Sequence, residues 1–277
     1  MKLHVALDIA GQTHPGMVRH GNEDSIAAVP ECGLAVLADG MGGYNAGEVA
    51  SGMATSIIAN ALPSDLAALG EKSALTSSEG LHSLVRSEIS RANMSIFQAS
   101  QSDPKYAGMG TTLVFVLFQD EAVTVAHIGD SRLYRLRGDD FTQLTRDHSF
   151  VQEQIDAGLI SPEQAKFWFS KNLLTRALGV DPVTEAEIRD YDLRPGDVYL
   201  LCSDGLTDMV EDAEIKKTLQ SSSPNVEEAA DRLVQCANGH GGRDNVSVIV
   251  VRVQPESEPQ KYNYGIIDGL NSGAGHG

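Results

Sequence analysis

The sequence has few cysteines and few aromatic residues. Its 277 residues include three cysteines, Cys32, Cys202 and Cys236, which are far apart and form no C-x-x-C pair. This pattern excludes a disulfide scaffold and a cysteine zinc site, and it favours a reducing compartment. Aromatic residues make up 5% of the chain, so we expect no cluster of rings for stacking nucleotide bases.

Basic residues and long apolar runs are also scarce. Lys and Arg total 21 against 38 Asp and Glu, which gives a formal net charge of −17. Such a surface repels nucleic acids and anionic membranes. The longest apolar run, Leu113 to Phe118, is far shorter than the ~18–20 residues of a membrane span, and His4 and Asp8 interrupt the first apolar stretch, which is therefore no signal peptide. We expect a cytoplasmic protein with no nucleic-acid partner and no membrane insertion.

Two common catalytic signatures are missing. The chain contains neither a G-x-S-x-G elbow nor an H-E-x-x-H zinc motif,. The glycines from 42 to 47 have the spacing of a P-loop, but Glu48 follows where that loop needs a lysine to neutralise phosphate,. The excess of acidic residues leaves two interpretations, a solvated acidic surface or carboxylates clustered to hold cations.

The hydrophobic pattern predicts an α+β fold. Apolar, β-branched runs that pair as hairpins alternate with segments of helical spacing, and no internal repeat is visible. Strands are expected at Leu34–Ala38, Thr111–Phe118, Ala122–Ile128, Leu133–Leu136, Phe141–Leu144, Asp197–Cys202 and Val246–Val253, and helices at Gly47–Leu62, Ser83–Ser100, Phe150–Leu159, Asp212–Leu219 and Val226–Cys236.

The composition changes after residue 254. Residues 255–277 are rich in Pro, Gly, Ser and Asn, as expected of a flexible C-terminal tail,. The tail also contains Tyr262, Tyr264, Ile266 and Ile267, which could dock on another surface. We therefore expect one domain over residues 1–254, followed by the tail.

Four aspartates follow apolar segments or glycine loops. They are Asp39 in LADGMGG, Asp130 in HIGDSR, Asp204 in CSDGLTD and Asp244 in GGRDNVSV. A single Asp-Gly pair can be only a turn. Four aspartates at the ends of strands instead suit hard divalent cations, which need anionic oxygen ligands on a fixed backbone. Upstream, MVRHGNEDS adds Arg19, Glu23 and Asp24 in a loop after the first strand.

Eight motifs in order resemble those of one enzyme family. RHGNEDS, LADGMGG with AGEVAS, GTT, HIGDSRLY, TRDHS, LLTRALG, LLCSDGLTDMV and GGRDNVSVIVV are similar to the motifs of bacterial protein phosphatases of the 2C type, over about residues 5–253. These are metal-dependent serine/threonine protein phosphatases. The resemblance implies a four-layer α-β-β-α sandwich in which helix pairs flank two antiparallel sheets.

The resemblance also implies a set of metal ligands for Mn²⁺ or Mg²⁺. Asp39 would bridge two ions, the Gly40 carbonyl would bind one of them, and Asp204 and Asp244 would complete the second. A third, weaker ion would lie near Asp130, with Asp208 as a further candidate ligand. All-oxygen ligation favours these metals over zinc.

The remaining site residues follow from the same resemblance. Arg19 would bind the substrate phosphate, and Glu23 and Asp24 would hold metal-bound waters. Two cations can activate a water for direct attack on phosphorus, so no covalent phosphoenzyme is needed. Several relatives carry a histidine at the position of Met41 as a proposed general acid, so here the proton donor would be a metal-bound water, or less readily His127 or His148.

The implied function is hydrolysis of phosphoserine and phosphothreonine in proteins. The chain would act as a monomer on phosphorylated proteins and oppose a bacterial serine/threonine kinase. Two alternatives stay open: a catalytically weak phosphatase-like binding module, and a phosphatase of a small phosphoester. None of Asp39, Asp204 and Asp244 is missing, which weighs against the first alternative.

Overall fold

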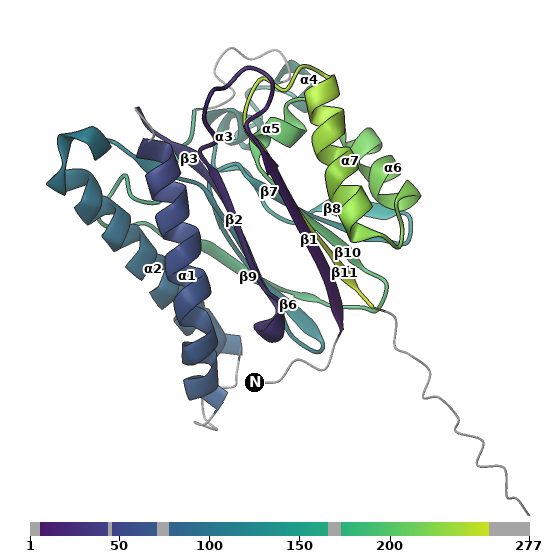
Figure 1. The fold of residues 1–277 in the computed structure, drawn as a ribbon, viewed down its shortest axis with the longest axis horizontal. Coiled ribbons are helices and arrows are strands. Elements are labelled where there is room, and N and C mark those ends of the chain that lie inside the picture. The colour runs from purple at the N-terminus through teal and green to yellow at the C-terminus, as the bar shows by residue number, and fades with distance from the viewer. Residues whose placement is uncertain (1–5, 44–45, 71–77, 166–172, 255–277) are drawn as a thin grey trace, which may run out of the picture.

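Two antiparallel sheets pack face to face, and each is covered on its outer face by a pair of helices (Figure 1). The computed structural model describes residues 6–43, 46–70, 78–165 and 173–254. Helices α1 (Ala46–Gly70) and α2 (Ser78–Ser102) cover one sheet, and α6 (Asp212–Ser221) and α7 (Val226–Gly239) cover the other. The expected four-layer α-β-β-α sandwich is confirmed.

The strand order places the first and the last strand side by side. One sheet has the order β1-β11-β10-β7-β8 and the other β2-β3-β5-β6-β9, with the short β4 paired to β3. The strands are β1 (Leu7–His14), β2 (Asp24–Val29), β3 (Leu34–Met41), β4 (Gly110–Thr111), β5 (Leu113–Phe118), β6 (Ala122–Ile128), β7 (Arg132–Arg137), β8 (Asp140–Gln143), β9 (Glu187–Asp192), β10 (Val198–Cys202) and β11 (Val246–Val253).

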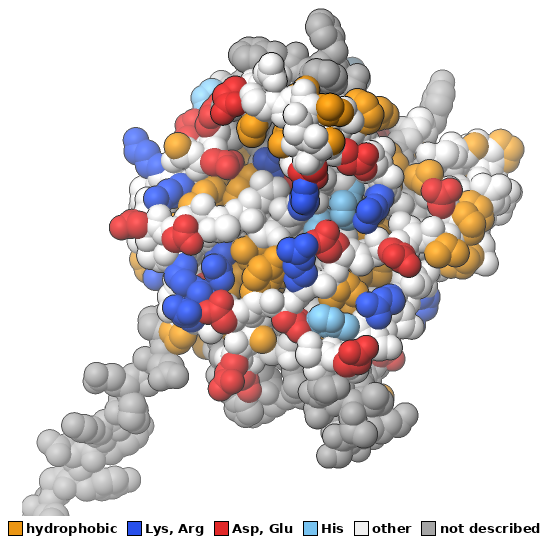
Figure 2. All heavy atoms as spheres, turned by 180° about the vertical axis from the view of Figure 1, so that it is seen from behind, with side chains coloured by type: hydrophobic (Ala, Val, Ile, Leu, Met, Phe, Trp, Pro, Cys, Tyr) orange, Lys and Arg blue, Asp and Glu red, His pale blue; other side chains and the backbone are white. Residues whose placement is uncertain are grey.

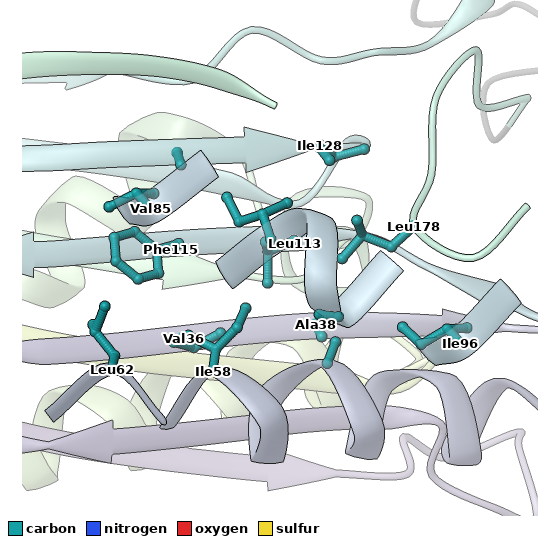
Figure 3. Close-up of a cluster of buried hydrophobic side chains, with 14 of the residues drawn as sticks. Val36, Ala38, Ile58, Leu62, Val85, Ile96, Leu113, Phe115, Ile128 and Leu178 are labelled. Carbon is teal, nitrogen blue, oxygen red and sulfur yellow. The ribbon is translucent and has the colours of Figure 1, made fainter. Parts of the chain in front are cut away.

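Alternation along the central strands explains why their apolar runs are continuous. In β3, Leu34 and Val36 pack with helices α1 and α2, whereas Ala35 and Leu37 face the other sheet. Figure 3 shows Val36 and Phe115 of the first of these layers close to Ile58 of α1. Because both faces of these strands are buried, every position is apolar.

The opposite sheet follows the same rule. Val246, Val248 and Val250 of β11 pack under α6 and α7, and Ile249 and Val251 fill the space between the sheets. The sandwich thus has three apolar layers, which fix the positions of the strand ends. Short helices α3 (Phe150–Asp156), α4 (Pro162–Ala165) and α5 (Asp204–Thr207) lie at the same end of the sandwich as the loop joining β1 to β2 (Figure 1).

Several boundaries differ from the sequence prediction. The strand expected at Thr111–Phe118 is interrupted at Thr112, whose hydroxyl binds another strand. The helix expected to end at Leu62 continues past Pro63, because Leu66 is buried in the same core. Helix α3 ends before the expected Leu159, where Gly158 adopts a positive φ of 69°. Strand β9 was not predicted, since its sequence EIRDYD is mostly polar.

The negative charge is not concentrated on the face shown in Figure 2, where acidic and basic side chains are interspersed. None of the helices in the described ranges is both long and apolar enough to cross a membrane. The tail at 255–277 lies outside the described residues, so its expected flexibility stays a prediction.

Candidate metal centre

The predicted aspartates come together at one end of the sandwich. Asp24 is the first residue of β2 and lies opposite Asp39 of β3 in the antiparallel register. Asp204 begins α5 two residues after β10, and Asp244 lies two residues before β11. Because β10 and β11 are neighbours in one sheet and β2 and β3 in the other, both sheets contribute carboxylates to the same place.

Asp24 was expected in a loop, and that expectation is wrong. The structure makes it a buried strand residue, with one carboxylate oxygen accepting a hydrogen bond from Ser203 Oγ at 2.9 Å. Ser203 Oγ in turn accepts from the Ser247 N–H at 3.0 Å. The serines therefore anchor a carboxylate of one sheet to the backbone of the other.

Asp39 is held through its backbone by β4 and the residue after it. The Asp39 N–H donates to Thr112 Oγ1 at 2.9 Å, and the Asp39 carbonyl accepts from the Thr112 N–H at 2.8 Å and from Thr111 Oγ1 at 2.9 Å. Through these three hydrogen bonds the threonines of the GTT motif fix the backbone of Asp39, and so they fix the point from which its side chain extends.

The glycines after the aspartates serve close packing and not turns. A Cβ on Gly40 would lie 2.1 Å from the Gly47 carbonyl oxygen, and one on Gly205 would lie 1.9 Å from the Asn245 carbonyl oxygen. Gly40 lies within β3 and Gly205 within α5. The alternative that these Asp-Gly pairs are only turns is therefore wrong.

Asn245 holds the loop that carries Arg19 and Glu23. Its Nδ2 donates to the carbonyls of Pro15 and Gly21 at 3.0 and 2.8 Å, and its Oδ1 accepts from the Glu23 N–H at 2.8 Å. Sequence reasoning missed this role, because an asparagine in a charged motif gives no signal of which backbone groups it will bind. Its neighbour Asp244 accepts from Arg19 Nη2 at 2.7 Å.

The carboxylates repel one another. Burial and the charges of Asp24, Asp204, Asp130 and Asp244 raise the pKa of Asp39 well above its usual range. Burial, followed by the charges of Asp130, Asp208 and Asp244, does the same to the pKa of Asp204.

Asp24 and Asp130 are affected in the same direction. Burial raises the pKa of Asp24 to about 6, and burial together with Asp147 raises the pKa of Asp130 to about 6. Burial also raises the pKa of Glu23, although Arg19 opposes the shift. Such shifts mark a site that lacks compensating positive charge.

The donor set fits divalent cations. Asp24 Oδ1 is buried and has no hydrogen-bond partner among the described residues. Asp39, Asp130, Asp204 and Asp244 are partly exposed, so their oxygens can be reached from solvent. Clustered carboxylate oxygens and a backbone carbonyl are the ligands that Mg²⁺ and Mn²⁺ prefer. A bound cation would stabilise this cluster, because it would offset the repulsion between the carboxylates.

A cavity of about 900 Å³ adjoins this centre. Its lining includes Asp130, Asp204 and Asp208, together with Arg132 and Asp147. Asp208, at the end of α5, is exposed. Its charge contributes to the raised pKa of both Asp130 and Asp204, so the structure brings it to the edge of the centre.

A second cluster of metal-binding residue types lies next to the loop that carries Asp130. Within the described ranges, His127, His148 and Glu187 place donor atoms within 4.8 Å of one another. However, His148 Nδ1 accepts a hydrogen bond from the Gly129 N–H at 3.2 Å, so the neutral ring carries its proton on Nε2 and cannot offer that nitrogen to a metal. We therefore assign no metal to this trio.

His127 and His148 are both buried. His127 is 3% exposed and stacks on His148 with ring centroids 4.7 Å apart. Burial lowers the pKa of both rings, that of His148 to about 4. Both rings bind backbone groups, and Met41 packs beside Gly110.

Comparison with known proteins identifies the family. The family described as Protein phosphatase 2C matches residues 19–244. The chain is 38% identical over 243 residues to the serine/threonine phosphatase stp of Listeria innocua, covering 87% of this chain and 93% of that protein.

Solved structures agree with this match. The Mycobacterium tuberculosis serine/threonine phosphatase PstP/Ppp is 38% identical with a TM-score of 0.79, covering 90% of this chain and 99% of that one. A catalytic domain of PstP in complex with two manganese ions is 39% identical with a TM-score of 0.77, with the same coverage. The chain belongs to the protein phosphatase 2C family.

Proposed function

We propose that this chain is a metal-dependent protein phosphatase that hydrolyses phosphoserine and phosphothreonine. The observation that carries the proposal is the convergence of Asp39, Asp204 and Asp244 from separate segments into one cluster of carboxylates, with the exposed Arg19 at its edge. The similarity to serine/threonine phosphatases, one of them with two manganese ions bound, supports it.

The ligands of two Mn²⁺ or Mg²⁺ ions are proposed as follows. Asp39 would hold both ions, the Gly40 carbonyl would contribute to one, and Asp204 and Asp244 would contribute to the other. When bound, the two cations supply a nucleophilic water at neutral pH and positive charge for the phosphoryl oxygens. A third, weaker ion is assigned to Asp130 with Asp208.

Other residues orient water and substrate. Glu23 and Asp24 hold waters next to the cations: the Asp24 carboxylate is fixed by Ser203 at one oxygen and is orphaned at the other. Arg19 is 54% exposed and uses Nη2 to hold Asp244, so its planar guanidinium can turn its remaining donors to phosphate oxygens. This binding neutralises the charge that a nucleophile must approach.

The biological role is the reversal of a serine/threonine kinase. We propose that the chain acts on phosphorylated proteins in the cytoplasm as a monomer, with residues 1–254 as the catalytic domain. Three free cysteines agree with a reducing compartment,.

The test is release of inorganic phosphate from phosphoserine, phosphothreonine and phosphotyrosine peptides, with Mn²⁺ or with EDTA. The proposal expects Mn²⁺-dependent turnover of the first two and little of the third. No turnover of any peptide, despite binding of phosphopeptide, would favour a binding module. Turnover of p-nitrophenyl phosphate alone would favour a small phosphoester as substrate.

A further inference from the structure

The segment Asp147–His148 holds the loop that carries Asp130 from both sides. On one side, the His148 N–H donates to the Gly129 carbonyl at 2.9 Å, and the Gly129 N–H donates to His148 Nδ1 at 3.2 Å. On the other side, Arg132 donates to both oxygens of Asp147, Nε to Oδ1 at 3.0 Å and Nη2 to Oδ2 at 2.7 Å. His148 thus fixes Gly129 and Asp147 fixes Arg132, and these two residues flank Asp130 and Ser131 in the chain.

No residue with a side chain fits at Gly129 without strain. Its φ is +100°, and a Cβ there would lie 2.7 Å from Cβ and Cγ2 of Thr112. A glycine with positive φ has no side chain to anchor it and has many alternative conformations. The position of the next residue, Asp130, therefore depends on the hydrogen bonds that His148 makes with Gly129.

The loop is also connected to the bridging ligand of the proposed centre. Thr112 Oγ1 lies 2.7 Å from Ser131 Oγ and accepts from the Asp39 N–H at 2.9 Å. Thr112 therefore contacts Asp39 and both neighbours of Asp130. A displacement of the 129–132 loop would move Asp130 of the weaker cation site more than Asp39, because Asp39 keeps its other backbone bonds to Thr111 and Thr112.

The histidine ring is built to accept this one hydrogen bond. His148 is 7% exposed and is stacked on His127, whose Nε2 contacts the backbone of Arg146, so the plane of the ring is fixed. His148 Nε2 is buried without a hydrogen-bond partner among the described residues, and Glu187 Oε2 lies 3.9 Å away. A buried N–H without a partner costs stability. An apolar side chain would avoid that cost, so packing alone does not explain a histidine, whereas an acceptor for the Gly129 N–H does.

We propose that His148, together with Asp147, is a positioning residue for Asp130 and so determines the affinity of the weaker cation. This inference rests on the proposed function, because that function assigns Asp130 to the third ion. It gives the TRDHS and GTT motifs a shared role behind the metal ligands.

Two substitutions of His148 distinguish its role as a hydrogen-bond acceptor from its role in packing. In His148→Asn, Oδ1 takes the place of Nδ1 and keeps an acceptor, whereas His148→Leu fills the site without one. Isothermal titration with Mn²⁺, supported by melting temperatures, measures the affinity of each ion. We expect His148→Leu to raise the Kd of the weakest ion at least tenfold and the Kd values of the two tighter ions less than threefold. His148→Asn should keep the Kd of every ion within threefold of the wild-type value. If His148→Leu does not fold, Arg132→Lys replaces it with the same expectation, because it keeps the charge but loses the bidentate contact with Asp147 on the other side of the loop.

A double-mutant comparison tests whether the effect passes through Asp130. In an Asp130→Asn background, adding His148→Leu should change kcat/KM by less than twofold at the Mn²⁺ concentration that half-saturates the weakest ion of the wild type, because the positioned group is already gone. An equal, additive loss would overturn the proposal, as would wild-type binding of the weakest ion by His148→Leu or loss of all ions together. If the wild-type protein binds no Mn²⁺, the proposed function itself fails, which is a different outcome from a change confined to His148.

Discussion

Replacing Asp130 with asparagine should stabilise the metal-free protein at neutral pH. Burial and the charge of Asp147 raise the pKa of Asp130 from 3.8 to about 6 in the folded protein. The folded state therefore binds the proton more tightly than the unfolded chain, and stability falls as pH rises from about 4 to about 6. Above that range the penalty is constant, and the neutral amide of the Asp130→Asn variant would not carry it.

The magnitude follows from the shift. A change of roughly two pKa units corresponds to about 3 kcal/mol, at 1.36 kcal/mol per unit. Because Asp130 is partly exposed, solvent screening reduces this value, and we expect a gain of ~1–3 kcal/mol. For a domain of this size each kcal/mol raises the melting temperature by ~2–4 °C.

The assay is urea unfolding of wild type and Asp130→Asn in EDTA, at pH 4 and at pH 7.5. The variant should be more stable at pH 7.5, with a difference that shrinks toward zero at pH 4. Asp231→Asn, which removes an exposed carboxylate on α7 outside the cluster, controls for the change in net charge. Equal stability of Asp130→Asn and wild type at pH 7.5 would refute the account of uncompensated charge in the centre.

Three further changes test other parts of the account. Gly205→Ala should lower the melting temperature by at least ~6 °C, since an added Cβ would overlap backbone at 1.9 Å,; Gly52→Ala, with open space in helix α1, should leave it unchanged or higher,. Arg19→Ala should lower kcat/KM on a phosphopeptide roughly tenfold or more through lost charge-assisted hydrogen bonds, while Arg232→Ala on α7 should not, and an unchanged value for Arg19→Ala would remove it from the site. Deleting residues 255–277 should leave kcat/KM on short phosphopeptides unchanged; a melting point lower by several degrees would show that they dock on the domain.

The sequence predicted the core strands, and it singled out the aspartates that the structure brings together, for one physical reason. Residues such as Leu113–Phe118 are buried on both faces and must be apolar throughout. Aspartates that end such strands stand out against them. Strand β9 was missed because it is an edge strand of its sheet with a polar sequence.

The supporting contacts could not be predicted in the same way. Asn245 bonds across more than 220 positions to Pro15, Gly21 and Glu23, and nothing in the local pattern indicates such partners. The burial of Asp24 also depends on Ser203, which belongs to the other sheet. Both roles arise from the way the two sheets meet and not from periodicity.

The proposed function depends on Asp39, which would hold both of the cations that activate water for attack on phosphorus. The most direct measurement is the rate of phosphate release from a phosphothreonine peptide by Asp39→Asn and wild type at saturating Mn²⁺. Loss of the bridging carboxylate should raise the barrier by several kcal/mol, so we expect the variant to retain less than about a tenth of the wild-type rate while its metal-free melting temperature is unchanged or higher. Retention of more than about a tenth of the rate would contradict the claim.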